Sequence, residues 1–555
     1  MREPGLVHEA PHDPPAGVRA RTWLPAAGFA LVPYLWLVRR FDWLCDDAFI
    51  SFRYSRHLAE GHGLVFNLGE SPRVEGYSNF LWVLVLTPFE ALGLDLALAA
   101  RLGSIACGVL LLVLVARTAQ REFGLGTWAT AATALFFACL PSVSVWSTSG
   151  LETMPFALAL FGVFERSSPL AGRDERASRS IGAGLWAVLA ALLRADGALW
   201  AGALLAINAL VPSKPGLRER LRAVFVPLSM LALATALHVA WRLWYYGVPL
   251  PNTAYAKAGL SSLHLERGID YVASYVLSVP ICLLVPIVAV ALRSARHSVI
   301  VHRAALVCVF ACLWAVYTGG DFMAMGRFLA PVMAFEAVLL GCILAALASR
   351  GARGTVGAAA VAAASVALAL LPSFDVHPIP SALRERFHFR WGSPEKLTEY
   401  QQWLTMKQRF AYWELIARAL ALHTQPGESI VFGAIGVVGY RTELFLFDPY
   451  GLVSPEIARS PREPMRASPG HDRQVGPEFF IEQDPDYLDA LVVPTGTPTN
   501  AGIDPSWHSA PWAKRLQIES HALREDAGFP RGLELRLIHL QRDRSGSGRV
   551  LGRPP

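Results

Sequence analysis

Long apolar runs alternate with short polar loops along the chain from Trp23 to Leu371. Most of these runs are about 15–22 residues long, and a helix needs about 20 predominantly apolar residues to cross a bilayer. The pattern therefore predicts a polytopic α-helical membrane protein with about eleven spans. We place them at roughly residues 23–38, 96–116, 128–140, 154–164, 181–193, 198–211, 223–244, 271–292, 304–318, 328–348 and 355–371.

The long apolar runs stop near residue 372, and the pattern that follows predicts a soluble α/β domain over residues 373–541. Residues 394–424 have the periodicity of one amphipathic helix. Short apolar runs at 428–432, 489–494 and 534–540 are typical of strands. The final residues, 542–555, are predicted to be a disordered tail.

Glycines follow the first predicted strand at positions 433, 436 and 439, and this spacing is GxxGxxG. A dinucleotide-binding turn has the spacing GxGxxG, so the sequence argues against a nucleotide cofactor here. We expect Gly436 and Gly439 to allow close backbone packing instead. The part of the chain after residue 372 contains no cysteine, which argues against a disulfide framework or a cysteine-based zinc site there.

The distribution of charge gives the orientation. Hydrophobic residues make up 53% of the 555 and charged residues 17%, whereas soluble domains carry roughly a quarter charged residues. The net charge is +6, but the arginines gather in loops after alternate apolar runs and form no basic stripe of the kind that binds nucleic acid. By the positive-inside rule those loops are cytoplasmic. Residues 1–22 are then a cytoplasmic tail, 23–372 the membrane domain, 39–95 the first outer loop and 373–541 an extracytoplasmic domain.

This orientation depends on one apolar segment, residues 79–88. Counting it as a span would move every later arginine-rich loop to the outside. We predict that it is an interfacial helix on the outer face, a role that suits its Trp and Pro residues.

The predicted outer loops carry most of the ionisable side chains with candidate chemistry. The first loop opens with the adjacent Asp46 and Asp47 and continues through Arg53. Carboxylates at a membrane face are costly to desolvate and usually mark function. The remaining candidates are Glu152, Arg194, Asp196, Asn252, Lys257, Asp321 and Arg327 in the other outer loops and His471 in the soluble part.

Structural interpretations exist for these residues: helix capping, a salt bridge, a snorkelling lysine or a surface turn. They apply to Asp46, Asp47, Glu152 and Asp321, to the pair Arg194 and Asp196, to Lys257, and to His471. The sequence favours a common site because five separate loops each bring ionisable groups to the same membrane face.

Such a set of groups suits glycosyl transfer from a lipid phosphate. Arginine and lysine pair with phosphate, and a carboxylate acts as general base on an acceptor hydroxyl. A phosphate leaving group needs neutralisation of its charge more than a strong acid. The chemistry requires no cofactor, and the sequence leaves a divalent metal open.

The two adjacent aspartates are expected to have different roles. Neighbouring residues at the start of a helix project about 100° apart, so both are not expected to reach the same sugar. We predict that one is the catalytic carboxylate, with Asp47 favoured by position. The other would hold the loop, by capping the following helix or by pairing with Arg53 or Arg56.

Three segments of the first outer loop resemble a known family: Asp46–Tyr54 (DDAFISFRY), Glu60–Asn67 (EGHGLVFN) and Val74–Trp82 (VEGYSNFLW). They resemble membrane glycosyltransferases of the GT-C class, and in particular the terminal β-(1→2)-arabinofuranosyltransferases of mycobacterial cell-wall synthesis. Shorter segments that also resemble this family are Ser149–Thr153, Pro251–Thr253, Ala256–Lys257, Gly319–Met323, Arg327–Phe328, Asp448–Val453 and Pro469–His471.

The resemblance implies a GT-C-like fold, a polyprenyl-phosphate sugar donor and an active site outside the cytoplasm. It also implies a catalytic acid in the first outer loop, at Asp46 or Asp47. One departure is Ala195, because relatives often have a proline between the arginine and the aspartate of this hairpin.

We therefore predict a multi-pass glycosyltransferase of the bacterial inner membrane. It would move a sugar, arabinofuranose being one candidate, from a polyprenyl-phosphate donor to a cell-envelope glycan or other acceptor. Its partners are then the bilayer, the donor and the acceptor, with no nucleic acid. The alternative is a transporter or flippase of lipid-linked sugars, which should show inverted repeats or broken helices. The sequence indicates neither.

Overall fold

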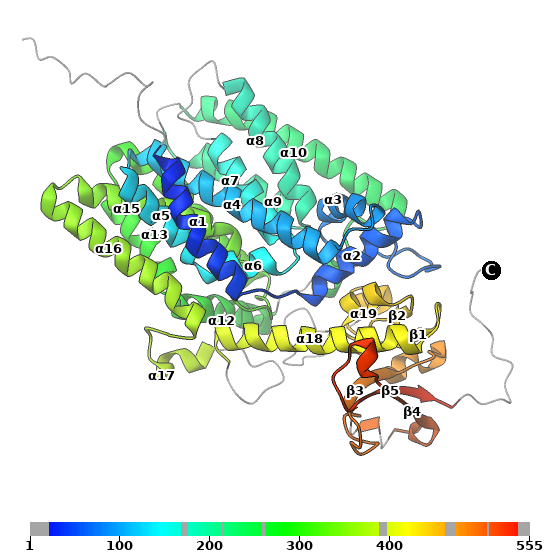
Figure 1. Ribbon diagram of the computed structural model, residues 1–555. Coiled ribbons are helices and arrows are strands. Elements are labelled where there is room, and N and C mark those ends of the chain that lie inside the picture. Colours follow the sequence, from blue (N-terminus) through cyan, green and yellow to red (C-terminus); the bar gives the residue numbers. More distant parts are fainter. Residues whose placement is uncertain are drawn as a thin grey trace, which may run out of the picture.

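A computed structural model describes residues 22–167, 176–213, 216–257, 261–387, 397–460, 473–504, 506–507 and 510–541. Helices α1 to α16 form a large helical bundle (Figure 1). A smaller α/β region follows in the chain and packs at one end of the bundle, and the long helix α18 runs along the junction between the two (Figure 1).

The helical part begins at α1 and ends with α16, and its elements differ widely in length. They are α1 (Trp23–Arg40), α2 (Asp46–Ala59), α3 (Phe80–Ala91), α4 (Leu96–Phe123), α5 (Thr127–Cys139), α6 (Pro141–Thr148), α7 (Thr153–Arg166), α8 (Arg176–Leu193), α9 (Gly197–Leu210), α10 (Leu217–Tyr246), α11 (Asn252–Lys257), α12 (Ser262–Ser278), α13 (Ile281–Leu292), α14 (Ser298–Tyr317), α15 (Met333–Ala348) and α16 (Ala352–Leu370).

Within the described residues, five helices are long and apolar enough to cross a membrane, and up to seven spans result if each of two bent helix pairs counts as one. The five are Leu96–Phe123, Leu217–Tyr246, Ser298–Tyr317, Ala330–Ala348 and Ala352–Phe374. The protein is therefore a multi-pass membrane protein, as the sequence predicted. The count of about eleven spans is not confirmed, since several of the predicted spans are shorter helices.

One predicted span is broken and another is followed at once by a bent helix, which corrects the expectation of unbroken helices. The predicted span 128–140 is followed, after a bend of 55°, by α6, and the predicted span 271–292 is split into α12 and α13 with a bend of 83°. A proline stands at each break, Pro141 at the first position of α6 and Pro280 just before α13. Proline lacks the N–H that would continue the preceding helix, so each break follows from the local sequence.

The segment predicted to be an interfacial helix is α3, which has 12 residues. At 1.5 Å per residue it is about 18 Å long, too short to cross the roughly 30 Å hydrocarbon core. Helix α7 contrasts with it, because nearly all of its residues are buried among neighbouring helices. The bundle thus has a central helix whose N-terminal end lies beside the polar loops described below.

The C-terminal region is α/β, as predicted. Its helices are α17 (Ser381–Arg384), α18 (Glu399–His423), α19 (Ile435–Arg441) and α20 (Pro455–Arg459), and its strands are β1 (Ser429–Val431), β2 (Phe445–Phe447), β3 (Asp489–Pro494), β4 (Leu516–Ala522) and β5 (Leu533–Leu540). Strands β1 and β2 pair in parallel, with Ser429 opposite Phe445. The other sheet is antiparallel in the order β3–β5–β4.

Three of the strands were predicted from the sequence, and β2 and β4 were not. Strand β2 has only three residues, and β4 has mixed polar and apolar positions that are partly or fully exposed. The predicted tails, residues 1–21 and 542–555, lie outside the described residues.

Candidate active site

The two adjacent aspartates occupy the first turn of α2, directly after the extended residue Cys45. The amide of Cys45 donates to the carbonyl of Ser149 at 3.0 Å, which joins the start of α2 to the loop between α6 and α7. Because Asp46 and Asp47 are adjacent on a helix, their side chains leave the backbone in different directions.

Asp46 is bound to the C-terminal region. Its carboxylate accepts hydrogen bonds from the amides of Gly436 and Val437 at 3.1 and 2.8 Å, at the start of α19. Burial raises the pKa of Asp46 to about 7, although the bond from Val437 opposes that shift. Asp46 thus binds the first turn of α19, whereas the sequence analysis expected one of the two aspartates to cap α2 or to pair with Arg53 or Arg56. Tertiary packing brings a different helix to this carboxylate.

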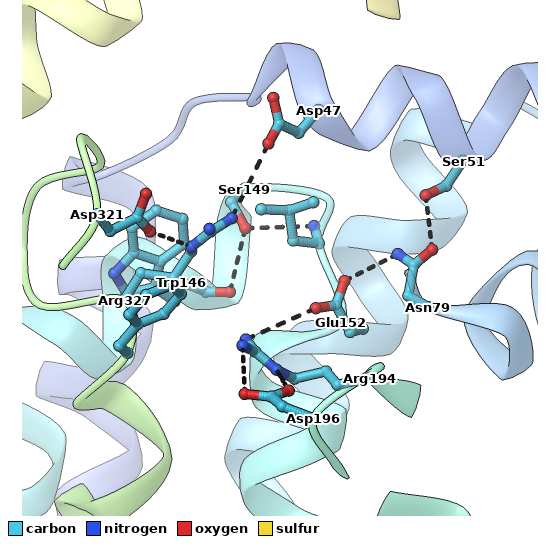
Figure 2. A network of polar contacts seen from close by, with 12 residues as sticks. Asp47, Ser51, Asn79, Trp146, Ser149, Glu152, Arg194, Asp196, Asp321 and Arg327 are labelled. Atoms are coloured by element: carbon cyan, nitrogen blue, oxygen red, sulfur yellow. Dashed lines mark hydrogen bonds and ion pairs between the residues drawn. The ribbon is translucent and has the colours of Figure 1, made fainter. Parts of the chain in front are cut away.

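Asp47 contacts a different part of the protein and keeps 29% of its side chain exposed. Its carboxylate lies 4.0 Å from a guanidinium nitrogen of Arg327 (Figure 2). The two aspartates therefore have different surroundings: each oxygen of Asp46 accepts a backbone hydrogen bond in a buried position, whereas Asp47 is partly exposed.

Arg327 lies between two carboxylates, Asp47 and Asp321 (Figure 2). The Asp321 carboxylate is the nearer, at 2.5 Å. Burial lowers the pKa of Arg327, but Asp321 and then Asp47 more than offset this and hold that pKa above its usual range. The ring of Trp146 lies below the guanidinium, with its centroid at 6.0 Å.

The loop that carries Arg327 has an unusual backbone. Gly319, Gly320, Met325 and Gly326 all have positive φ, and Met325 is the one of them with a side chain, at φ 58°. A non-glycine residue in the left-handed region is strained and persists only where its surroundings hold it. The carbonyl of Met325 accepts from the indole of Trp146 at 3.1 Å, which is one such contact.

A second ion-pair group lies beside the first. Arg194 donates to both oxygens of Asp196 at 2.8 and 3.2 Å, and Glu152 approaches Arg194 to 4.0 Å. Burial raises the pKa of Asp196, but Arg194 outweighs it and the pKa falls below its ordinary value. The indole of Trp314 also donates to Asp196, at 2.9 Å.

The sequence analysis missed the polar side chains that connect this second group to α2. Asn79 donates to Glu152 at 2.8 Å and accepts from Ser51 at 3.0 Å (Figure 2). Both lie in segments that carry the family resemblance, Asp46–Tyr54 and Val74–Trp82, and this was the signal available.

Glu399 was also missed. It is the first residue of α18 and is 1% exposed. Its carboxylate accepts from the amide of Met325 at 2.5 Å and from the hydroxyl of Ser274 at 3.0 Å. Burial raises the pKa of Glu399 to about 7. In the sequence it appears as one polar position of an amphipathic helix, so no local signal marked it.

Two predicted site residues lie away from this cluster. Arg53 is 3% exposed and donates to the carbonyls of Phe66, Gly439 and Leu444. Asn252 donates to the carbonyls of Gly451 and Leu452. Both side chains bind the C-terminal region and lie outside the cluster in which the sequence placed them.

Two further predicted residues lie outside what the structure describes. Lys257 ends α11, but its side chain is not among the described ones, and His471 falls in the undescribed segment 461–472. The structure therefore brings together Asp47, Glu152, Arg194, Asp196, Asp321 and Arg327. Four carboxylates in this set face two guanidinium groups, and Asp47 is the most exposed of the six.

The glycines after β1 pack closely, as expected. A Cβ on Gly436 would lie 2.0 Å from the carbonyl oxygen of Asp46, and one on Gly439 would lie 2.7 Å from the guanidinium of Arg53. Both positions exclude a side chain because another backbone or a buried arginine occupies that space.

Comparison with known proteins adds three findings. A family model described as "Domain of unknown function (DUF8728)" matches residues 399–529. The chain is 29% identical over 286 residues to the terminal β-(1→2)-arabinofuranosyltransferase of Mycobacterium tuberculosis (strain ATCC 25618 / H37Rv). That match covers 49% of this chain and 44% of the mycobacterial protein, so it spans less than half the length of its relative.

The third finding concerns the fold. The crystal structure of ArnT from Cupriavidus metallidurans bound to undecaprenyl phosphate matches with a TM-score of 0.55 at 17% identity, over 94% of this chain and 98% of that one. The apo structure of the same protein matches with a TM-score of 0.55 at 17% identity, over 93% of this chain and 97% of that one. The resemblance to membrane glycosyltransferases of the GT-C class is confirmed, and at this identity the structural likeness concerns the fold.

Proposed function

We propose that this protein is a glycosyltransferase that moves a sugar from a polyprenyl-phosphate donor to an acceptor hydroxyl of the cell envelope. The observation that carries the proposal is the contrast within the aspartate pair. Both oxygens of Asp46 accept hydrogen bonds from backbone amides, whereas Asp47 is partly exposed and faces Arg327. This provides one accessible carboxylate beside one buried cation, the two groups that the reaction needs.

The arginines supply the site for the donor phosphate. Arg194 and Arg327 each have a carboxylate at close range and a second one at 4.0 Å. A phosphate oxygen in place of the distant contact would form a shorter charge-assisted hydrogen bond. Lys257, the last residue of α11, is proposed as a third cation. The undecaprenyl phosphate bound to ArnT in its crystal structure supports a lipid phosphate of this class.

Asp47 then acts as the general base. It takes the proton of the acceptor hydroxyl while that oxygen forms a bond to the anomeric carbon of the donor sugar. The bond from the anomeric carbon to the phosphate oxygen breaks, and the lipid phosphate leaves with its charge stabilised by the arginines. Proton transfer of this kind contributes typically about 10²–10⁴-fold in rate.

We place this site on the extracytoplasmic face of the bacterial inner membrane. The arginines Arg117, Arg121 and Arg166 lie near the other ends of α4 and α7, and such loops are cytoplasmic by the positive-inside rule. A lipid-linked donor fits this placement because it brings its own activated phosphate. The sugar is proposed to be a pentose such as arabinofuranose, on the likeness to the mycobacterial relative.

The test is transfer by purified full-length protein in lipid nanodiscs. The protein is incubated with a panel of polyprenyl-phosphate pentoses and hexoses and an oligosaccharide acceptor, and products are measured by mass spectrometry. The expected result is an acceptor heavier by one sugar, with Asp47→Asn as the inactive control. Movement of donor across a liposome bilayer without any product would support the flippase alternative and overturn the proposal.

A further inference from the structure

The two sides of the candidate site are each held by a buried carboxylate at the boundary with the C-terminal region. Asp46 precedes Asp47 in the chain and binds the amides of Gly436 and Val437. Glu399 opens α18 and binds the amide of Met325, two residues before Arg327. Each carboxylate therefore ties one reactive group to chain beyond residue 372.

The second of these connections continues along α18. One turn after Glu399, the side-chain NH₂ of Gln402 donates to the carbonyl of Phe322 at 2.9 Å. One turn later, the sulfur of Met406 lies 3.5 Å from the amide nitrogen of Ala324. Three residues on one face of α18 thus contact the loop between Asp321 and Arg327. This row of contacts explains how the loop keeps Met325 at φ 58°.

The first connection leaves no room for adjustment. A Cβ on Gly436 would lie 2.0 Å from the carbonyl oxygen of Asp46, so α19 touches the backbone that carries Asp47. The carboxylate of Asp46 has both oxygens occupied, by two amides that come from one helix turn. A shift of α19 would therefore carry the first turn of α2 with it.

On the basis of the proposed function, we propose that Asp46 and Glu399 are positioning residues through which the C-terminal region sets the separation of Asp47 and Arg327. Neither residue needs to touch substrate. Asp46 fixes where the base stands, and Glu399 fixes where the phosphate-binding arginine stands. The soluble region is then part of the catalytic apparatus, since without it these two groups lack their fixed distance.

Substitutions separate this role from a catalytic one. In Asp46→Asn one of the two amides loses its acceptor, because the new NH₂ group cannot accept a hydrogen bond. We expect about 10–100-fold lower kcat, as for a misplaced reactive group, with the Kd for undecaprenyl phosphate within about threefold of wild type. Gly436→Ala should reproduce this loss, although it changes no charge and no residue of the cluster.

Glu399 has its own pair of variants. Glu399→Ala leaves the amide of Met325 without an acceptor and should weaken both donor binding and kcat, since Arg327 moves. Glu399→Gln retains one oxygen for Met325 and an NH₂ group for the hydroxyl of Ser274, so it should restore both. A matched control is Asp489→Asn, because the side chain of Asp489 bonds to Ala490 within β3 and not to a site loop.

Hydrogen exchange in the full-length protein tests the positioning role without a measurement of turnover. Asp46→Asn and Glu399→Ala should raise exchange in peptides covering 434–441 and 319–329, respectively, and Asp489→Asn should raise neither. Unchanged exchange together with kcat equal to that of Asp489→Asn would overturn the inference. If only Asp47→Asn then loses activity, the inference is wrong and the proposed function is retained. If the wild-type protein is inactive on every donor, the proposed function is wrong, and hydrogen exchange still tests the inference.

Discussion

Two buried ion-pair systems lie at the end of the bundle that meets the C-terminal region, and they are built differently. Glu75 and Arg242 form a closed pair, with 2.9 Å between the charged atoms and side chains 0% and 8% exposed. The hydroxyls of Tyr77 and Tyr246, 3.2 Å apart, lie beside it. Burial raises the pKa of Glu75 to about 7, against the effect of Arg242.

The cluster around Arg327 is open by comparison. Asp47 is 29% exposed and stands 4.0 Å from Arg327, and Glu152 stands 4.0 Å from Arg194. These distances are at the limit of an ion pair, so a phosphate or hydroxyl oxygen can replace a weak contact without breaking a strong one. Burial of charge alone therefore does not mark the site. The candidate site differs from the closed pair because its charged groups are partly exposed and incompletely paired.

The largest expected effect is on turnover at the open cluster. Asp47→Asn keeps the shape of the side chain and removes the base, so kcat should fall by about 10²–10⁴-fold. Glu75→Gln is the comparison at the closed pair, and it should leave kcat of the correctly folded fraction close to wild type. Near wild-type turnover in Asp47→Asn would contradict the distinction between the two systems.

The next effect is on stability, and it should fall on the closed pair. Arg242→Ala leaves Glu75 buried without its partner, which typically costs about 3–5 kcal/mol. The double variant Glu75→Gln with Arg242→Met should recover much of that loss, because no unpaired charge remains. Thermal unfolding of all three proteins in the same detergent provides the measurement. If Arg242→Ala is as stable as wild type, the pair of Glu75 and Arg242 does not stabilise the fold.

A smaller effect is expected on donor binding. Arg327→Ala removes a charge-assisted phosphate contact, worth roughly 1.5–3 kcal/mol, or about a 10–150-fold rise in Kd. Titration with undecaprenyl phosphate, followed by native mass spectrometry, measures this Kd. The control is Arg117→Ala, which removes an arginine near the C-terminal end of α4. If Arg327→Ala and Arg117→Ala bind undecaprenyl phosphate with the same Kd, Arg327 does not bind the donor phosphate and its role is confined to its ion pairs.

The smallest effect is a pH dependence of stability at Glu399. Burial raises its pKa to about 7 from an ordinary value of 4.5, so the folded state binds this proton more tightly than the unfolded state does. The stabilisation is complete below about pH 4.5 and is lost as the pH rises through about 7. Glu399→Gln should remove this loss and gain roughly 1–3 kcal/mol at pH 8 relative to pH 5.

Unfolding of Glu399→Gln and wild type at pH 5 and pH 8 compares the two slopes directly. The same difference between pH values in both proteins would exclude Glu399 as the titrating group. This measurement is independent of turnover, because the variant is expected to retain activity.

The sequence by itself determined the class of protein, the polar loops at one end of the helices and most of the residues in the cluster. These features depend on local properties: the length of apolar runs, the composition of loops and the residue types that phosphate chemistry needs. It also predicted that the two aspartates would differ in role, from helix geometry alone.

Only the tertiary structure decided which groups meet. Asp46 finds its partners 390 and 391 residues later in the chain, and Glu399 reaches back 74 residues to Met325. Arg53 was a candidate site residue, but packing surrounds it with main-chain carbonyls. No local pattern encodes such contacts, because each depends on the position of a second element. A carboxylate binds a helix terminus, stays partly exposed or closes an ion pair according to what packs against it.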